Sequence, residues 1–188
     1  MSNAYYELHI TVAPHDILKF SAFCREREAK PLYIELNKGV HRHQAMLAVV
    51  NHLPGDEAAV AWANAYAANV IEPHFKIDRV KLESRLVVGP NEYYEAHWKL
   101  EFPRFPEGEC RLEEFLETNP NLLRSWNLFD TRIQYLSQRI YKSQDPIAAS
   151  ETFAASGELM KSCGLPVVKT HYERCVADNN PTLDHGWA

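Results

Sequence analysis

Two copies of the pattern Tyr-Tyr-Glu-x-His hold the residues of this chain that are best suited to chemistry. The first copy runs from Tyr5 to His9 and the second from Tyr93 to His97. Imidazole titrates near neutral pH, so a histidine beside a carboxylate can act as a general acid or base. Histidine and glutamate are also metal ligands. The repetition therefore indicates two kinds of chemistry, acid–base catalysis and metal binding.

Alternating residue types predict that both copies lie on β-strands, over 5–12 and 93–102. Residues two apart on a strand share a face. The polar faces of the two strands then carry Tyr5, Glu7, His9 and Thr11, and Tyr93, Glu95, His97 and Lys99. The opposite faces are apolar and must pack against helices, so we expect the polar residues on an open face of each sheet.

The segments that follow the two strands match each other in order. An amphipathic helix comes first, then two extended runs, an alanine-rich helix and a final strand. The expected first helices span 14–29 and 107–119, and the expected final strands span 74–84 and 167–177. This order predicts an internal duplication of a βαββαβ unit.

A βαββαβ unit with right-handed crossovers forms a ferredoxin-like sandwich. We therefore predict an α+β fold in which two such sandwiches, residues 1–90 and 91–188, pack together as pseudo-symmetric halves of one compact unit. A cleft between the halves would be lined by both open faces. Arg79 and His171 fall at matching positions on the final strands and would point toward this cleft. The alternative for Arg79 and Lys81 is a solvated, charged strand edge.

Composition and charge favour a soluble globular protein over a nucleic-acid-binding or membrane protein. The 188 residues are 46% hydrophobic and 24% charged, which is typical of a soluble globular protein. The net charge of −5 argues against general nucleic-acid binding, which requires a basic surface. No stretch approaches the roughly 20 apolar residues of a membrane helix, and the N-terminus has no targeting pattern. Four scattered cysteines favour free thiols, so we expect a cytoplasmic protein without a membrane partner.

The leading hypothesis is a site for a small anionic molecule, such as a phosphate ester or nucleotide, in the cleft between the halves. His9 and His97 would be the catalytic acid and base that hydrolyse it, and Glu7 and Glu95 would orient them. The residues expected to contact the ligand surround these pairs. They are Thr11 and Lys99 at the phosphate, Tyr5 and Tyr93 at the rim, and Arg79 and His171 on the final strands.

This arrangement resembles the two-histidine (2H-type) phosphoesterases, a duplicated family with a His-x-Thr or His-x-Ser motif on a strand of each half. His9-Ile10-Thr11 matches the motif, whereas Lys99 replaces the hydroxyl residue of the second copy. Glu-Ala-His-Trp-Lys also resembles the charged strand of triphosphate tunnel enzymes, with a histidine in place of a metal-binding carboxylate. The combination of "YYEAH" with a terminal "LDHGW" is similar to an uncharacterised bacterial family, which implies no functional residues.

Two alternatives use the same residues. In one, His9, His97 and His171 bind a divalent metal ion in a metal-dependent enzyme. In the other, the protein binds a ligand or partner protein without catalysis, and the Glu-x-His pairs are polar pairs on a sheet surface. Only the first alternative requires a cofactor.

The C-terminal segment, residues 178–188, is rich in polar side chains and ends in an aromatic one. In one interpretation Trp187 anchors the segment over the cleft, which would bring Asp178 or Asp184 near the histidines. In the other the terminus is disordered.

Overall fold

The computed structural model of the protein describes residues 3–13, 16–85, 89, 91–101, 106–141 and 145–184. The strands are β1 (Ala4–Val12), β2 (Lys30–Leu36), β3 (His43–Leu53), β4 (Ile77–Ser84), β5 (Tyr93–Glu101), β6 (Leu123–Asn127), β7 (Asp130–Tyr141) and β8 (Val167–Asp178). The helices are α1 (Ile17–Glu26), α2 (Asp56–Tyr66), α3 (Pro106–Thr118) and α4 (Pro146–Ser162), with short turns η1 (Ala67–Ile71) and η2 (Pro181–Asp184). Among the described residues, no helix has the length and apolar character needed to span a membrane.

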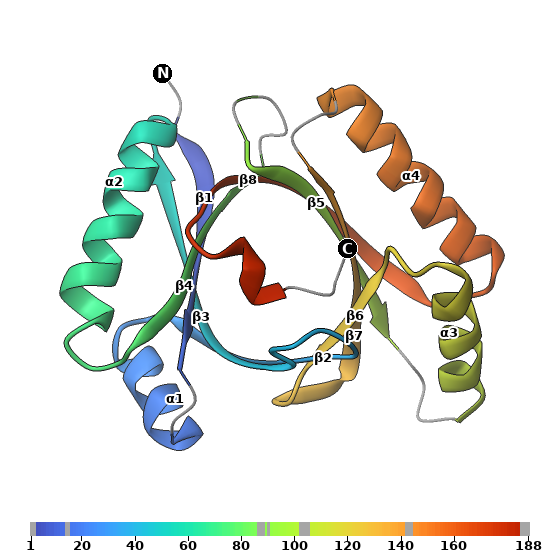
Figure 1. The fold of residues 1–188 in the computed structure, drawn as a ribbon, viewed down its shortest axis with the longest axis horizontal. Coiled ribbons are helices and arrows are strands. Elements are labelled where there is room, and N and C mark those ends of the chain that lie inside the picture. The colour runs from blue at the N-terminus through green and yellow to red at the C-terminus, as the bar shows by residue number, and fades with distance from the viewer. Residues whose placement is uncertain are drawn as a thin grey trace.

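The eight strands form one closed barrel in the order β1-β3-β2-β6-β7-β5-β8-β4, and β4 pairs with β1 to complete the ring. All neighbouring strands are antiparallel. Figure 1 shows the ring with its helices on the outside, α1 and α2 next to β1 and β4 and the other two helices on the opposite side.

The predicted fold class, two ferredoxin-like sandwiches packed against each other, was wrong. The order β-α-β-β-α-β does occur twice along the chain. However, the two sets of strands are joined along both edges, β2 to β6 and β4 to β8, into a single barrel. The physical reason lies in the edge strands, whose unpaired N–H and C=O groups gain hydrogen bonds when the sheet closes.

Two apolar cores lie between the barrel wall and the helices. On β1 the alternate residues Tyr6, Leu8 and Ile10 are buried in one core with residues of α1 and α2. On β5 the residues Ala96 and Trp98 are buried in the other, together with residues of α3 and α4. Because neighbours on a strand point to opposite faces, the polar residues between them point into the barrel. The barrel interior is therefore polar along these strands.

Candidate functional site

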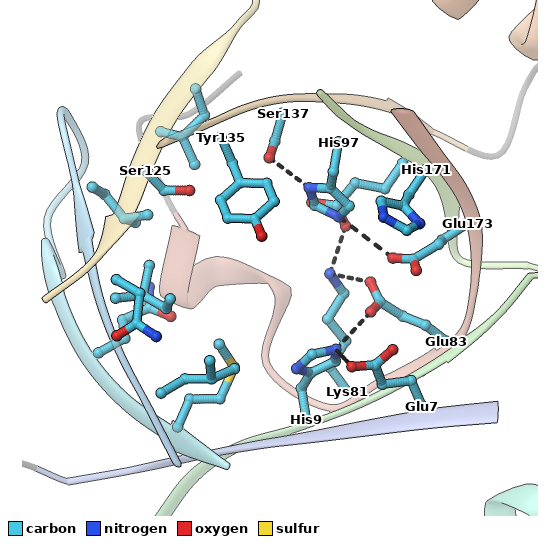
Figure 2. Close-up of a pocket in the computed structure, with 18 of the residues that line it drawn as sticks. Glu7, His9, Lys81, Glu83, His97, Ser125, Tyr135, Ser137, His171 and Glu173 are labelled. Atoms are coloured by element: carbon cyan, nitrogen blue, oxygen red, sulfur yellow. Dashed lines mark hydrogen bonds and ion pairs between the residues drawn. The ribbon is translucent and has the colours of Figure 1, made fainter. Parts of the chain in front are cut away.

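The barrel encloses a cavity of about 540 Å³, to which all eight strands contribute side chains. This volume lies in the range of known small-molecule sites, about 300–1,000 Å³. Part of its wall is a cluster of ionisable side chains, which Figure 2 shows around Lys81. Elsewhere on the wall, apolar side chains alternate with polar ones.

Lys81 of β4 is the centre of the ionisable cluster. Its Nζ lies 2.5 Å from Glu83 Oε1 and 2.5 Å from Glu95 Oε2. Nε2 of His9 lies 3.0 Å from Glu83 Oε2, and Nε2 of His97 lies 3.8 Å from Glu95 Oε1. Lys81 therefore links the two repeated motifs, since it contacts Glu95 directly and His9 through Glu83, although β1 and β5 are not neighbours in the barrel.

The two histidines differ in what their second ring nitrogen contacts. Nδ1 of His97 lies 2.6 Å from the hydroxyl oxygen of Ser137 on β7, and its Nε2 lies 3.5 Å from Glu173 Oε2 on β8. Nδ1 of His9 is buried and has no hydrogen-bond partner within the described part of the chain. A histidine that binds a metal usually donates its other N–H to a fixed acceptor, which His97 can do.

The buried groups of the cluster differ in protonation. Burial opposes the ionisation of Glu83, but Lys81 and His9 outweigh it and hold the Glu83 pKa well below its usual range. Burial raises the pKa of Glu173 to about 9, and the charge of Glu83 adds to this rise. Burial also lowers the pKa of His97. At neutral pH we therefore expect an ionised Glu83, a protonated Glu173 and a neutral His97.

Three of these side chains form a set of possible metal ligands. One ligand atom each of Glu83, His97 and Glu173 lies within 4.8 Å of the other two. Ligand atoms around one zinc ion lie about 2.0–2.2 Å from it, so small side-chain rotations would bring this set onto a common ion. A neutral imidazole and carboxylates suit zinc, iron or manganese.

The C-terminal segment folds back into the barrel, where its carboxylates join a second group of charged side chains. The η2 turn lies within the ring of strands in Figure 1, and Asp184 at its end lines the cavity. Asp184 accepts hydrogen bonds from Arg79 at 2.6 Å, from Arg139 at 3.1 Å and from Gln44 at 3.1 Å. Trp187, the expected anchor of this segment, lies outside the described residues.

Arg79 also binds Asp178 of β8 through two hydrogen bonds, of 2.9 and 2.5 Å. The hydroxyl of Tyr93 donates to the same carboxylate at 2.7 Å. Arg79 is 4% exposed and Tyr93 is 1% exposed. Arg79 is thus no solvated edge residue, and Tyr93 belongs to a buried ion-pair network instead of the rim of a cleft.

The buried ion-pair network of the cavity has more negative than positive charges. Its members are four ionised carboxylates (Glu83, Glu95, Asp178 and Asp184) and three cations (Arg79, Lys81 and Arg139). The rest of the cavity lining adds three cations (Lys30, Arg85 and Lys99) and three carboxyl groups (Glu7, Asp130 and Glu173), so the charges of the whole lining nearly balance. Arg79 and Arg139 already form ion pairs with carboxylates of the protein.

Most of the side chains selected from the sequence line the cavity. These are Glu7, His9, Arg79, Glu95, His97, Lys99 and His171. Thr11 is buried opposite Arg79 on β4, and the hydroxyl of Tyr5 donates to Glu7 at 2.9 Å. Of the three histidines expected to bind a metal, the structure brings His97 into the possible ligand set of the described residues.

Sequence reasoning missed the carboxylates of that set. Glu83 and Glu173 each lie two residues beyond a selected or considered residue, Lys81 and His171, on the same strand face. Period-two alternation on the final strands would have found them. Ser137 had no such signal, since its place beside His97 depends on the register between β5 and β7.

No protein-family model matches this chain, and the search of curated proteins found no match. Solved structures similar to it include a monooxygenase described as putative from Lactobacillus acidophilus, with 11% identity and a TM-score of 0.32 over 95% of this chain and 96% of that one. A mutant chlorite dismutase from Candidatus Nitrospira defluvii has 9% identity and a TM-score of 0.33 over 99% and 96%. A heme-binding protein from Thermus thermophilus has 8% identity and a TM-score of 0.28 over 93% and 92%.

The resemblance expected from the sequence was wrong. None of these similar structures is described as a two-histidine phosphoesterase, and no family model supports the expected bacterial family. The closed barrel also differs from the paired sandwiches that the phosphoesterase resemblance implied. The phosphoesterase hypothesis is therefore withdrawn.

Proposed function

We propose that this protein binds a divalent transition-metal ion inside its barrel and uses the ion to act on a small molecule held in the cavity. The observation that supports the proposal is the set of Glu83, His97 and Glu173, whose ligand atoms lie within 4.8 Å of one another at the cavity wall. Two carboxylates and one imidazole from three different strands would hold the ion.

The surroundings of the set favour an ion at this place. Ser137 would fix the His97 ring with Nε2 available to the ion in the tautomer whose Nδ1–H donates to the Ser137 hydroxyl oxygen. Glu83, whose pKa is held well below its usual range, would attract the ion by its negative charge. Binding the ion would also release the proton of Glu173, whose pKa is otherwise raised to about 9.

Three protein ligands leave coordination positions open for water and for a substrate. A bound ion would polarise a substrate oxygen or lower the pKa of a bound water. His9 lies beside this place, with Nε2 3.0 Å from Glu83 and 3.7 Å from Glu7. Its role would be to accept or return a proton during the reaction.

Metal titration of the purified, chelator-treated protein tests the proposal. We expect one equivalent of Co²⁺, Mn²⁺ or Zn²⁺ to bind by calorimetry, with Co²⁺ giving a visible absorption spectrum that reports its ligands. Glu83→Gln and Glu173→Gln should abolish this binding, and Ser137→Ala should weaken it about 10- to 100-fold, as other losses of outer-shell partners do.

Glu35→Gln is the matched control, because Glu35 forms a Glu–His pair with His43 at 3.6 Å and does not line the cavity. Metal binding by this variant should equal that of the wild type. Absence of binding, or equal binding by the wild type and the Glu83 and Glu173 variants, would refute the proposal. A strong Soret band with hemin and no binding of divalent ions would refute it as well.

A further inference from the structure

The cavity has two unlike walls. Most ionisable side chains of the lining come from β1, β4, β5 and β8, which are consecutive in the ring, and Arg139 comes from the adjoining β7. The other four strands, β3, β2, β6 and β7, contribute the apolar side chains. These are Leu32, Ile34, Leu36, Met46, Leu123 and Ile133.

The apolar wall follows from the strand order. Because most of the charged side chains come from consecutive strands, the strands that carry the apolar side chains lie on the opposite arc, across the cavity. Leu36 and Leu123 pack together with Ile34 where β2 meets β6. This cluster faces the cavity and is separate from the two cores under the helices. It therefore offers an apolar surface to a ligand inside the barrel.

Hydroxyl groups interrupt the apolar wall. Ser125 and Tyr135 come from β6 and β7, and Figure 2 shows both of their oxygens pointing into the cavity. A ligand on the apolar wall could thus hydrogen-bond through a polar substituent.

We infer that the ligand of this cavity is an amphipathic carboxylic acid, with its carboxylate on the metal ion and its apolar body against the wall of Leu32, Met46 and Ile133. The inference rests on the proposed function, since it requires the ion. A carboxylate oxygen suits the open positions of a zinc, iron or manganese ion. Without the ion, the head group would face the carboxylate of Glu83 directly, and the two negative charges would repel each other.

The test is calorimetry of the metal-loaded full-length protein with acetate, butyrate and hexanoate. Burial of each methylene contributes about 0.8 kcal/mol, so affinity should rise about fourfold for each methylene added. The protein with its metal removed by chelator should bind none of the three. Met46→Gln has nearly the same length and places an amide in the apolar wall, so it should reduce hexanoate affinity about tenfold or more, with acetate affinity and metal binding unchanged.

Leu128→Gln is the matched control, because Leu128 is 40% exposed and is absent from the cavity lining. It should bind hexanoate as the wild type does. Ile133→Thr is a second variant of the apolar wall, and it replaces Met46→Gln if the latter fails to fold. Its hexanoate affinity should also fall.

The outcomes separate this inference from the proposed function. If no divalent ion binds, the proposed function fails and the inference fails with it. If the ion binds but acetate and hexanoate have equal affinities, the inference is overturned while the metal site stands. Hexanoate binding that is equal with and without the ion would also overturn the inference, since the carboxylate would then lie elsewhere.

Discussion

Replacing Asp184 by asparagine removes the negative charge that holds the C-terminal segment in the barrel. The side chain of Asp184 is 6% exposed and accepts hydrogen bonds from Arg79, Arg139 and Gln44. Asparagine has nearly the same shape but no charge, so the variant tests the ion pairs with little change in packing. We expect a folded protein of lower stability.

The magnitude follows from the contacts that remain. Loss of one partner of a buried ion pair costs about 3–5 kcal/mol. Arg79 keeps its two hydrogen bonds to Asp178, and Arg139 keeps Glu95 at 3.3 Å. The free energy of unfolding should therefore fall by an amount near the lower limit, about 3 kcal/mol. For a chain of this size that is a drop in Tm of about 6–12 °C.

The pH dependence gives an independent measure of the same interaction. Burial opposes the ionisation of Asp184, but Arg79 and Arg139 outweigh it and lower its pKa to about 2. The pKa of an unfolded aspartate is about 3.9. The stabilisation from this carboxylate is thus complete above pH 3.9 and is lost as the pH falls toward 2, and it amounts to roughly 2–3 kcal/mol.

Urea denaturation of the wild type and Asp184→Asn between pH 7 and pH 2.5 measures both effects. The difference between their unfolding free energies should be largest at neutral pH and should shrink below pH 4. Asp130→Asn is the control, because Asp130 forms an ion pair with Arg132 at 3.4 Å in which both side chains are largely exposed, and it should cost at most about 1 kcal/mol. A difference below 1 kcal/mol for Asp184→Asn, or one that does not change with pH, would refute the reasoning.

Three further predictions concern other parts of the molecule. In Gly157→Ala the new Cβ would lie 2.9 Å from Nε1 of the buried Trp98, so crowding of about 1–3 kcal/mol should exceed the helix-propensity gain of about 1 kcal/mol and lower the denaturation midpoint. Asp56→Asn removes the charge that accepts hydrogen bonds of 2.9 and 2.8 Å from Arg174, which is 2% exposed, and chemical denaturation should show a loss of about 2 kcal/mol. Because burial and neighbouring carboxylates raise the pKa of Glu173 to about 9, metal affinity measured by calorimetry should rise about tenfold per pH unit from pH 6.5 to 8.5.

Control variants, or results that would contradict the reasoning, accompany each of these three predictions. Gly55→Ala should change stability by less than about 0.5 kcal/mol, since no described atom lies within 4 Å of the Cβ that it adds. Glu158→Gln breaks an exposed ion pair with Lys161 and should also have a small effect. An equal loss in both glycine variants, or in both carboxylate variants, would contradict the reasoning. So would a metal affinity that is constant with pH.

The sequence by itself determined which side chains share a strand face. Alternation with a period of two placed Glu7 and His9 on one side of β1, with Leu8 and Ile10 on the other. This follows because successive side chains of any strand point to opposite faces, whatever the strand pairs with. The repetition of that pattern in β5 likewise predicted a second polar face with Glu95 and His97.

Only the tertiary structure decided which other side chains those polar faces contact. Strand pairing uses backbone N–H and C=O groups that every residue has, so the joining of β2 to β6 and of β4 to β8 has no side-chain signature. Because the ring closes, the polar faces of β1 and β5 line one common cavity. It also brought Lys81 of β4 to Glu95 of β5 across the intervening β8, and it placed Asp184 between two arginines. These contacts depend on barrel closure and register, which are properties of the assembled sheet.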